Sequence, residues 1–275
     1  MRPGRREQRR VTEFDTEAFR DLLTTAILGR RLTALDSVPS TQDLAREVAG
    51  ESLRNPDGEV VLTEFQTQGR GRRRRAWSSP PNVNLLFSLI LCPRPRIARP
   101  TLITLLMGGA VREALATGSG VDASVKWPND VLIGGRKVAG ILTEEGRRPD
   151  GRPFWVVGVG INVNGSREDL TGELAHTATT LRAECGHETP REELLARLLA
   201  EFEEHYGAMQ RGQLDDILAW LRRRVDGMGA PVRVRAGDAE ITGAAAGLDD
   251  DGALVVRTSH GTLSRVEAGD DVEWL

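Results

Sequence analysis

The sequence has little cysteine, little histidine and no long apolar segment, and each shortage excludes a class of protein. Cys92 and Cys185 are the only cysteines, and the four histidines are scattered singly, so neither a zinc-binding pattern nor a disulfide framework is present. No apolar run approaches the ~20 residues that a membrane-spanning helix needs. The basic start, residues 1–10, has no apolar stretch after it, so we expect a solvated terminus rather than a secretory signal. These absences predict a cytoplasmic protein with no structural metal and no membrane partner.

Several enzyme motifs are also missing. The sequence contains no G-x-x-x-x-G-K-[ST], which argues against a P-loop NTPase, and neither H-E-x-x-H nor G-x-S-x-G. The G-x-G of residues 158–160 is not completed to G-x-G-x-x-G. If the protein is an enzyme, its reaction need not use a nucleophilic side chain.

The positive charge that is present is concentrated in one place. Lysine and arginine total 37 against 40 acidic residues, whereas a dedicated nucleic-acid binder usually shows a basic excess over a whole domain. Yet residues 68–80, QGRGRRRRAWSSP, place five arginines between Arg70 and Arg75, interrupted only by Gly71. Such a loop could hold nucleic acid, attract a protein partner or bind a small anion. Mutual repulsion predicts that residues 67–77 are mobile until an anion binds.

Hydrophobic patterning predicts two domains of different type. Helical spacing or N-cap residues indicate helices over 15–29, 41–50, 100–118 and 189–209, the last beginning at Thr189 and Pro190. Strand-like runs cover 32–38, 59–65, 84–92 and several segments between 123 and 164. From about residue 227 onward, short strands alternate with Gly and Asp turns, as in a small β-barrel. We therefore predict an α+β body with a mixed or largely antiparallel sheet, followed by a small β domain.

Three stretches carry residues suited to binding an anionic ligand. Gly69 and Gly71 allow the backbone of the arginine loop to approach a ligand, and arginine side chains bind phosphate or carboxylate in a bidentate manner. The second stretch, VKWPNDVLIGGRKVAG, supplies two lysines and an Asn-Asp pair, and the third, GVGINVN, supplies two asparagines after small residues.

These stretches together resemble the biotin protein ligases. The patterns GRGRxxRxW, KWPND followed by KxxGIL, and GxGINxN occur here in the family's order, after PSTQ and before a small C-terminal β module. The resemblance implies a class II synthetase-like catalytic domain over residues 31–226 and an SH3-like barrel over 227–275, preceded by a tail and helix over 1–30. About 30 residues before the catalytic core are fewer than the roughly 50 that a domain needs. We therefore expect the monofunctional type, without a DNA-binding repressor domain.

The resemblance implies a two-step reaction that needs ATP and Mg²⁺. The biotin carboxylate attacks the α-phosphorus of ATP and gives biotinyl-5′-AMP and pyrophosphate. A lysine of a biotin carboxyl carrier protein domain of an acyl-CoA carboxylase then attacks the mixed anhydride and AMP leaves. Positioning and charge neutralisation replace a protein nucleophile in such chemistry.

The family's residue roles transfer to matching positions of this sequence. Lys126 is the implied main electrostatic catalyst, and Arg72 is the second catalytic residue. The implied biotin-binding residues are Ser40, Thr41, Gln42, Gln66, Arg70, Gly71, Arg72 and Lys126; the implied ATP-binding residues are Arg75, Trp77, Asn129, Lys137 and Asn162.

Three positions depart from the family's usual residues. Gln42 stands where the family often has Asn, and its longer side chain reaches a different atom; Arg74 and Asn82 stand where it often has Gly. Because non-glycine residues avoid positive φ, we expect Arg74 not to adopt it, whereas Asn82 tolerates the left-handed region.

Two other functions stay open at the level of sequence. A lipoate ligase or octanoyl transferase would also act on a carrier lysine, although the Gly-rich loop and following histidine of those families are not found here. An RNA-binding or scaffold protein would use the arginine run directly and bind with a steep salt dependence.

Overall fold

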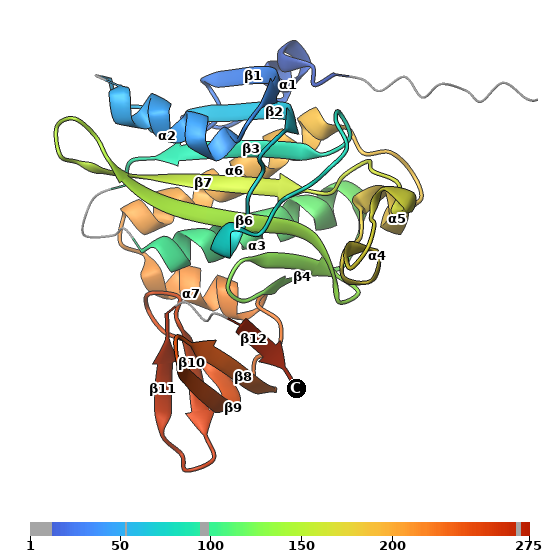
Figure 1. Cartoon of the computed structure of the whole chain (residues 1–275). Coiled ribbons are helices and arrows are strands. Elements are labelled where there is room, and N and C mark those ends of the chain that lie inside the picture. Colours follow the sequence, from blue (N-terminus) through green and yellow to red (C-terminus); the bar gives the residue numbers. More distant parts are fainter. Residues whose placement is uncertain (1–12, 53, 94–98, 268–270) are drawn as a thin grey trace, which may run out of the picture.

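The structure, a computed structural model, describes residues 13–52, 54–93, 99–267 and 271–275. A large sheet flanked by helices forms the body, and a smaller β domain lies at one end of it (Figure 1). Residues 1–10, which we expected to form a solvated terminus, lie outside the described residues. Within the part of the chain described, no helix combines the length and apolarity needed to cross a bilayer.

Seven strands build the larger sheet in the order β1-β2-β3-β7-β6-β5-β4. Only β1 and β2 run parallel; the other neighbouring pairs are antiparallel. The predicted α+β fold with a mixed sheet is therefore confirmed. The strands are β1 (Leu32–Val38), β2 (Val60–Gln66), β3 (Leu85–Leu91), β4 (Ala123–Lys126), β5 (Asp130–Ile133), β6 (Arg136–Arg147) and β7 (Pro153–Ile161).

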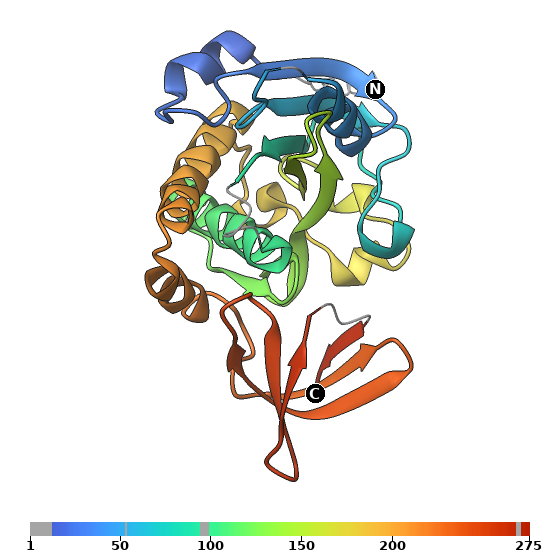
Figure 2. The same cartoon turned by 90° about the vertical axis from the view of Figure 1, so that its left-hand side faces the viewer.

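Helices cover both faces of this sheet, which explains why β3 is buried along its whole length (Figure 2). Helix α2 packs Ala45 and Ala49 on one face, against Val61, Ile90 and Val156. Helices α3 and α6 pack on each other and form most of the main core with the opposite face. The helices are α1 (Thr16–Leu22), α2 (Thr41–Glu51), α3 (Pro100–Ser119), α4 (Leu174–Thr177), α5 (Leu181–Cys185), α6 (Arg191–Gln210) and α7 (Leu214–Arg222).

Two helix predictions need correction. The helix predicted over 15–29 ends at Leu22, because the backbone N–H groups of residues 26–28 donate to the Glu203 carboxylate of α6 at 2.6–2.8 Å instead of to helical carbonyls. The helix predicted from Thr189 has Pro190 as its N-cap, without a side-chain cap. Thr189 instead exchanges two backbone hydrogen bonds of 2.9 Å with the Asn164 amide.

The C-terminal domain is a five-stranded antiparallel sheet in the order β11-β10-β9-β8-β12. It contacts the body at Trp127, whose buried indole N–H donates to the Gly252 carbonyl at 3.0 Å. Trp127 therefore belongs to the core. The strands are β8 (Pro231–Ala236), β9 (Ala239–Leu248), β10 (Leu254–Thr258), β11 (Leu263–Val266) and β12 (Asp271–Trp274).

A buried ion pair joins β2 to the start of α6. The side chains of Glu64 and Arg191 are 7 % and 5 % exposed and meet through two contacts, of 2.5 and 3.0 Å. Glu64 also accepts the Phe14 backbone N–H at 2.6 Å, and Arg191 donates to the Asn84 carbonyl at 3.0 Å. Each charge is therefore compensated by several hydrogen bonds, and losing one leaves the other buried and unpaired.

We expect Glu64→Gln to lower the free energy of unfolding by about 3 kcal/mol, because it leaves the Arg191 charge buried. Urea unfolding of the wild type and the variant measures this change. Glu193→Gln is a matched control: it removes the same charge from an exposed pair with Arg197, where we expect less than ~1 kcal/mol. Equal effects of the two substitutions would contradict the structural role of the buried pair.

Candidate active site

The start of α2 is held by side chains from two strands. Ser40 is the N-cap residue, but its side chain makes no cap bond. Instead, the Gln66 Oε1 atom accepts the Thr41 backbone N–H at 2.8 Å, and the Ser88 hydroxyl donates to the Thr41 hydroxyl at 2.9 Å. Gln66 therefore replaces a conventional cap. Ser88 was not predicted from the sequence, although it is the one polar residue of the apolar strand β3.

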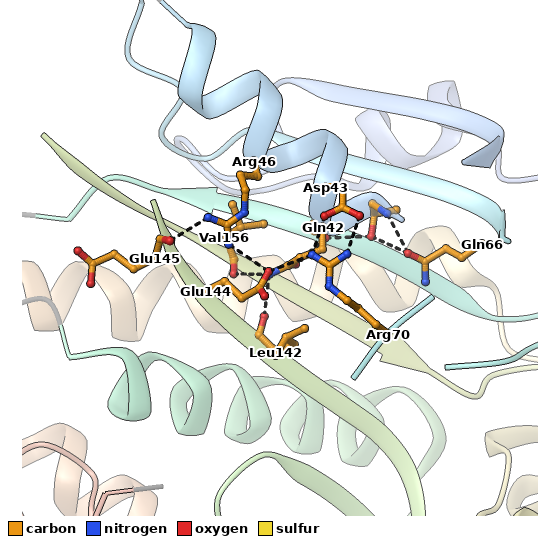
Figure 3. Close-up of polar contacts among 11 residues, drawn as sticks. Gln42, Asp43, Arg46, Gln66, Arg70, Leu142, Glu144, Glu145 and Val156 are labelled. Carbon is orange, nitrogen blue, oxygen red and sulfur yellow. Dashed lines mark hydrogen bonds and ion pairs between the residues drawn. The ribbon is translucent and has the colours of Figure 1, made fainter. Parts of the chain in front are cut away.

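Gln42 is buried and reaches across to the central strands (Figure 3). Its Nε2 atom donates to the carbonyls of Val156 at 3.0 Å and Leu142 at 3.3 Å, and its Oε1 atom lies 3.1 Å from the Ser88 hydroxyl. A Cβ atom on Gly158 would lie 2.4 Å from that Oε1. The longer amide at this position thus fits because β7 carries no side chain beneath it.

Trp77 rests on glycine backbone in the same way. A Cβ atom on Gly160 of β7 would lie 2.5 Å from the indole, and one on Gly140 of β6 would lie 3.1 Å from it. Gly140 and Gly160 are register partners, so they form a continuous bare surface under the ring. The indole N–H is buried and has no hydrogen-bond partner among the described residues, which leaves a donor for a ligand.

The arginine loop is a closed turn. A β-bridge joins Arg70 to Ala76, the Gly71 N–H donates to the Arg75 carbonyl at 2.7 Å, and the Trp77 N–H donates to the Gly69 carbonyl at 2.8 Å. Arg73 and Arg74 have φ of 55° and 59°, so the expectation that Arg74 avoids positive φ was wrong. Asn82 has φ of 65°, within the region that we expected it to tolerate. The turn 72–74 requires this strained backbone even without glycine.

The arginines of the loop differ in their contacts with the rest of the molecule. The Arg72 Nη1 atom donates to the Asn129 Oδ1 atom at 3.0 Å, which joins the loop to the KWPND stretch. Arg73, Arg74 and Arg75 are exposed. The Arg70 fork binds the Asp43 carboxylate at 2.5 and 2.6 Å, and this contact holds the pKa of Asp43 below its usual range.

Lys126 and Lys137 are the only two lysines of the sequence, and both belong to this region. Lys137 forms an ion pair of 2.7 Å with Asp130 and lies 5.6 Å from the centre of the Trp77 ring. Lys126 ends β4 opposite Asp130 and is half-buried. Within the described ranges, its ammonium forms no ion pair or hydrogen bond, so its charge is available to a ligand.

Asn162 and Asn164 have structural contacts. The buried Asn162 amide donates to the Thr179 carbonyl at 3.1 Å, just after β7 ends. Asn164 binds Thr189 as described above. The structure therefore places both where they secure the chain after β7.

A cavity of about 540 Å³ separates the arginine loop from β6. The Leu142 residue that lines it also accepts the Gln42 hydrogen bond, so the cavity adjoins the buried start of α2. The arrangement suits a ligand with a neutral, hydrogen-bonding head and an anionic end. The cavity is lined by Arg70, Gly71, Arg72, Arg73, Arg74, Leu142 and Glu144.

Comparisons with known proteins agree with this arrangement. The model of the Biotin/lipoate A/B protein ligase family matches residues 34–164, and that of the Biotin protein ligase C terminal domain matches residues 227–270. The chain is 34 % identical to the bifunctional ligase/repressor BirA of Bacillus spizizenii, over 98 % of this chain and 82 % of that protein. It is 33 % identical to the biotin–[acetyl-CoA-carboxylase] ligase of Mycobacterium tuberculosis, over 94 % and 95 %.

A solved structure shows the same fold. The biotin protein ligase of Aquifex aeolicus in complex with biotin and ATP superposes with a TM-score of 0.77 at 29 % identity. The match covers 90 % of this chain and 100 % of that one.

We expect Gly160→Ala to displace the Trp77 indole, because the added methyl group would lie 2.5 Å from the ring, and to cost about 1 kcal/mol of stability. Acrylamide quenching of tryptophan fluorescence measures the displacement. Quenching should increase in Gly160→Ala, and this increase should be absent when the same substitution is made in a Trp77→Phe background. Gly118→Ala is the matched control, since nothing lies within 4 Å of its added Cβ atom. Unchanged quenching in Gly160→Ala would contradict the glycine support of Trp77.

Proposed function

This chain belongs to the biotin/lipoate A/B protein ligase family, and from that premise we infer that it activates biotin with ATP and then joins biotin to a carrier lysine. It is a biotin protein ligase. The Mycobacterium tuberculosis relative named above is a biotin–[acetyl-CoA-carboxylase] ligase and matches 94 % of this chain. The observation that carries this conclusion is the meeting of the arginine loop and the buried start of α2 at one cavity, with Asn129 of the KWPND stretch hydrogen-bonded to the loop.

The geometry supports the first step through charge placement. A biotin carboxylate and the ATP α-phosphate repel each other, so their approach needs fixed cations. We propose that the unpaired Lys126 ammonium and the Arg72 guanidinium stabilise the charge that develops as the carboxylate oxygen bonds to phosphorus and pyrophosphate leaves. Arg72 is held toward this region by Asn129. In the second step the carrier lysine attacks the acyl carbon, its proton is lost and AMP leaves.

The buried polar groups support a binding place for the biotin head. We propose that Thr41, Gln42 and Ser88 face the head, with Gln66 fixing Thr41 through its amide oxygen. We also propose that Ser40 and Gly71 contact biotin. The nucleotide is proposed to lie against Trp77, whose indole N–H needs an acceptor, with Arg75, Asn129, Lys137 and Asn162 around it.

Mg²⁺ is proposed to arrive with ATP. Magnesium is commonly held by substrate phosphates and only one or two carboxylates. Among the described residues, no group of three or more His, Cys, Asp or Glu side chains forms a metal cage, and a phosphate-bound ion does not need one. The described residues are therefore compatible with a Mg²⁺ ion that is bound mainly by the ATP phosphates.

Several finer assignments stay predictions. The carrier is proposed to be the biotin carboxyl carrier domain of an acyl-CoA carboxylase, as the name of the Mycobacterium tuberculosis relative suggests. The absence of a repressor function, the cytoplasmic location and the domain limits at residues 30 and 226 are also predictions.

Biotin-dependent exchange of pyrophosphate into ATP by the purified protein tests the proposed function. Exchange with biotin and none with lipoate supports it. Exchange that requires lipoate would favour the lipoate ligase alternative, and no exchange together with salt-sensitive RNA binding would favour the RNA-binding alternative.

We expect Lys126→Gln to lower the rate of adenylation by about a hundredfold, as for loss of one preorganised charge, with a smaller loss of biotin affinity. Single-turnover formation of biotinyl-5′-AMP measures the rate, and equilibrium biotin binding measures the affinity. Lys126→Arg keeps the charge and should retain more of the rate. Near-normal adenylation by Lys126→Gln would remove Lys126 from the catalytic role.

We expect the Arg72→Gly variant to form biotinyl-5′-AMP but to release it early. The substitution removes the contact of the loop with Asn129 and the guanidinium proposed to bind the acyl-phosphate. Incubating the variant with ATP, biotin and albumin, then blotting for biotin, measures the escape. Arg147→Gly, which removes an exposed arginine at the end of β6, is the control. If Arg72→Gly consumes ATP without labelling albumin above the wild-type level, the loop does not retain the intermediate.

A further inference from the structure

An ionic cluster anchors the arginine loop to the body (Figure 3). Both terminal nitrogens of Arg70 bind Asp43 of α2, at 2.5 and 2.6 Å, and Nη2 also lies 3.4 Å from the Glu144 carboxylate of β6. Arg46, one turn along α2 from Asp43, pairs with the same Glu144 at 3.2 Å and donates to the Glu145 carbonyl at 2.9 Å. Two arginines thus alternate with two carboxylates.

Arg70 occupies the base of the loop. The Arg70–Ala76 bridge and the flanking hydrogen bonds, from Gly71 to Arg75 and from Trp77 to Gly69, close the loop at this residue. A side chain fixed here fixes both ends of the turn at once. The turn that carries Arg72 then projects from a base that is tied to α2 and β6.

The occupied fork of Arg70 makes it a poor receptor for a ligand anion. A carboxylate or phosphate that approached both terminal nitrogens would have to displace Asp43, which is itself an anion at the same contact. The Arg70 guanidinium lowers the pKa of Asp43, so that carboxyl stays ionised at neutral pH. The two charges of Arg70 and Arg46 are balanced by those of Asp43 and Glu144. Arg72, in contrast, donates from Nη1 to the neutral Asn129 amide oxygen at 3.0 Å.

We propose that Asp43 and Glu144 are positioning residues that hold Arg70 as an internal anchor of the loop, so that the Arg70 side chain does not bind the anionic end of the ligand. The proposal rests on the ligase function for its ligand but not for the anchor itself. It replaces the biotin-binding role that the sequence resemblance implied for Arg70.

A double-mutant cycle of Asp43→Asn and Arg70→Gln tests the anchor. If Arg70 acts through Asp43, each single variant should release biotinyl-5′-AMP about three- to fivefold faster, as expected for loss of a partly exposed ion pair, and the double variant should be no worse than the poorer single variant. Asp43→Glu keeps the carboxylate and should restore part of the retention. Asp150→Asn is the control: it removes a carboxylate that pairs with Arg152 and Arg148 at the turn between β6 and β7, and it should not change release.

Hydrogen exchange of the free protein gives a second readout that needs no ligand. Asp43→Asn should accelerate exchange of the Gly71 and Trp77 amides, whose hydrogen bonds close the loop, and Asp150→Asn should not. Unchanged exchange would overturn the anchor whether or not the wild type forms an adenylate. Failure of the wild type to form any adenylate would refute the ligase function and leave the exchange result to decide the anchor.

The release data separate the other mechanisms. Faster release in Arg70→Gln with normal release in Asp43→Asn would show that Arg70 binds the ligand directly. Slower release in Asp43→Asn would show that Asp43 competes with the ligand for Arg70. Either result would overturn the proposal.

Discussion

Bare backbone on the two central strands is the constraint on which the site depends. Gly158 and Gly160 lie on one face of β7, and Gly140 pairs with Gly160 from β6. A side chain at any of these positions would occupy space that now holds Gln42, Trp77 or Lys137. Because Gln42 belongs to α2 and Trp77 follows the arginine loop, the glycines set how closely both segments approach the central strands. A methyl group here would therefore disturb the site while leaving the core on the other face intact.

The site is assembled from parts that are attached to the body independently. The start of α2 is fixed by Gln66 and Ser88, and the arginine loop is fixed by Asp43 and Glu144. Lys126 precedes the buried Trp127, whose indole N–H donates to the Gly252 carbonyl of the C-terminal domain. The proposed catalytic lysine is therefore next in the sequence to a residue that the C-terminal domain binds, although that domain supplies none of the proposed side chains.

Local patterns predicted the strands and the long helices because burial on both faces leaves continuous apolar runs, as in β3. Local patterns failed where a distant group changes the local preference. The Glu203 carboxylate accepts the backbone N–H groups of residues 26–28, so α1 does not continue to residue 29. The Asn164 amide binds the backbone of Thr189, the residue that we expected to cap α6. The resemblance indicated the arginine loop and Lys126, but not Ser88, Asp43 or Glu144, whose roles depend on partners far away in the sequence. The positive φ of Arg74 likewise comes from the closed turn and not from the residue type.

The scarcity of lysine has a consequence for an enzyme that makes an amine-reactive anhydride. Lys126 and Lys137 are its only lysines, and every other basic side chain except histidine is an arginine. A guanidinium stays protonated and offers no free electron pair, so these arginines attract anions without being acylated by them. Lys137 is engaged by Asp130, which further limits its reaction. An escaping intermediate therefore finds few side-chain amines on this protein, because Lys126 and Lys137 are the only two in the sequence and both belong to the proposed site.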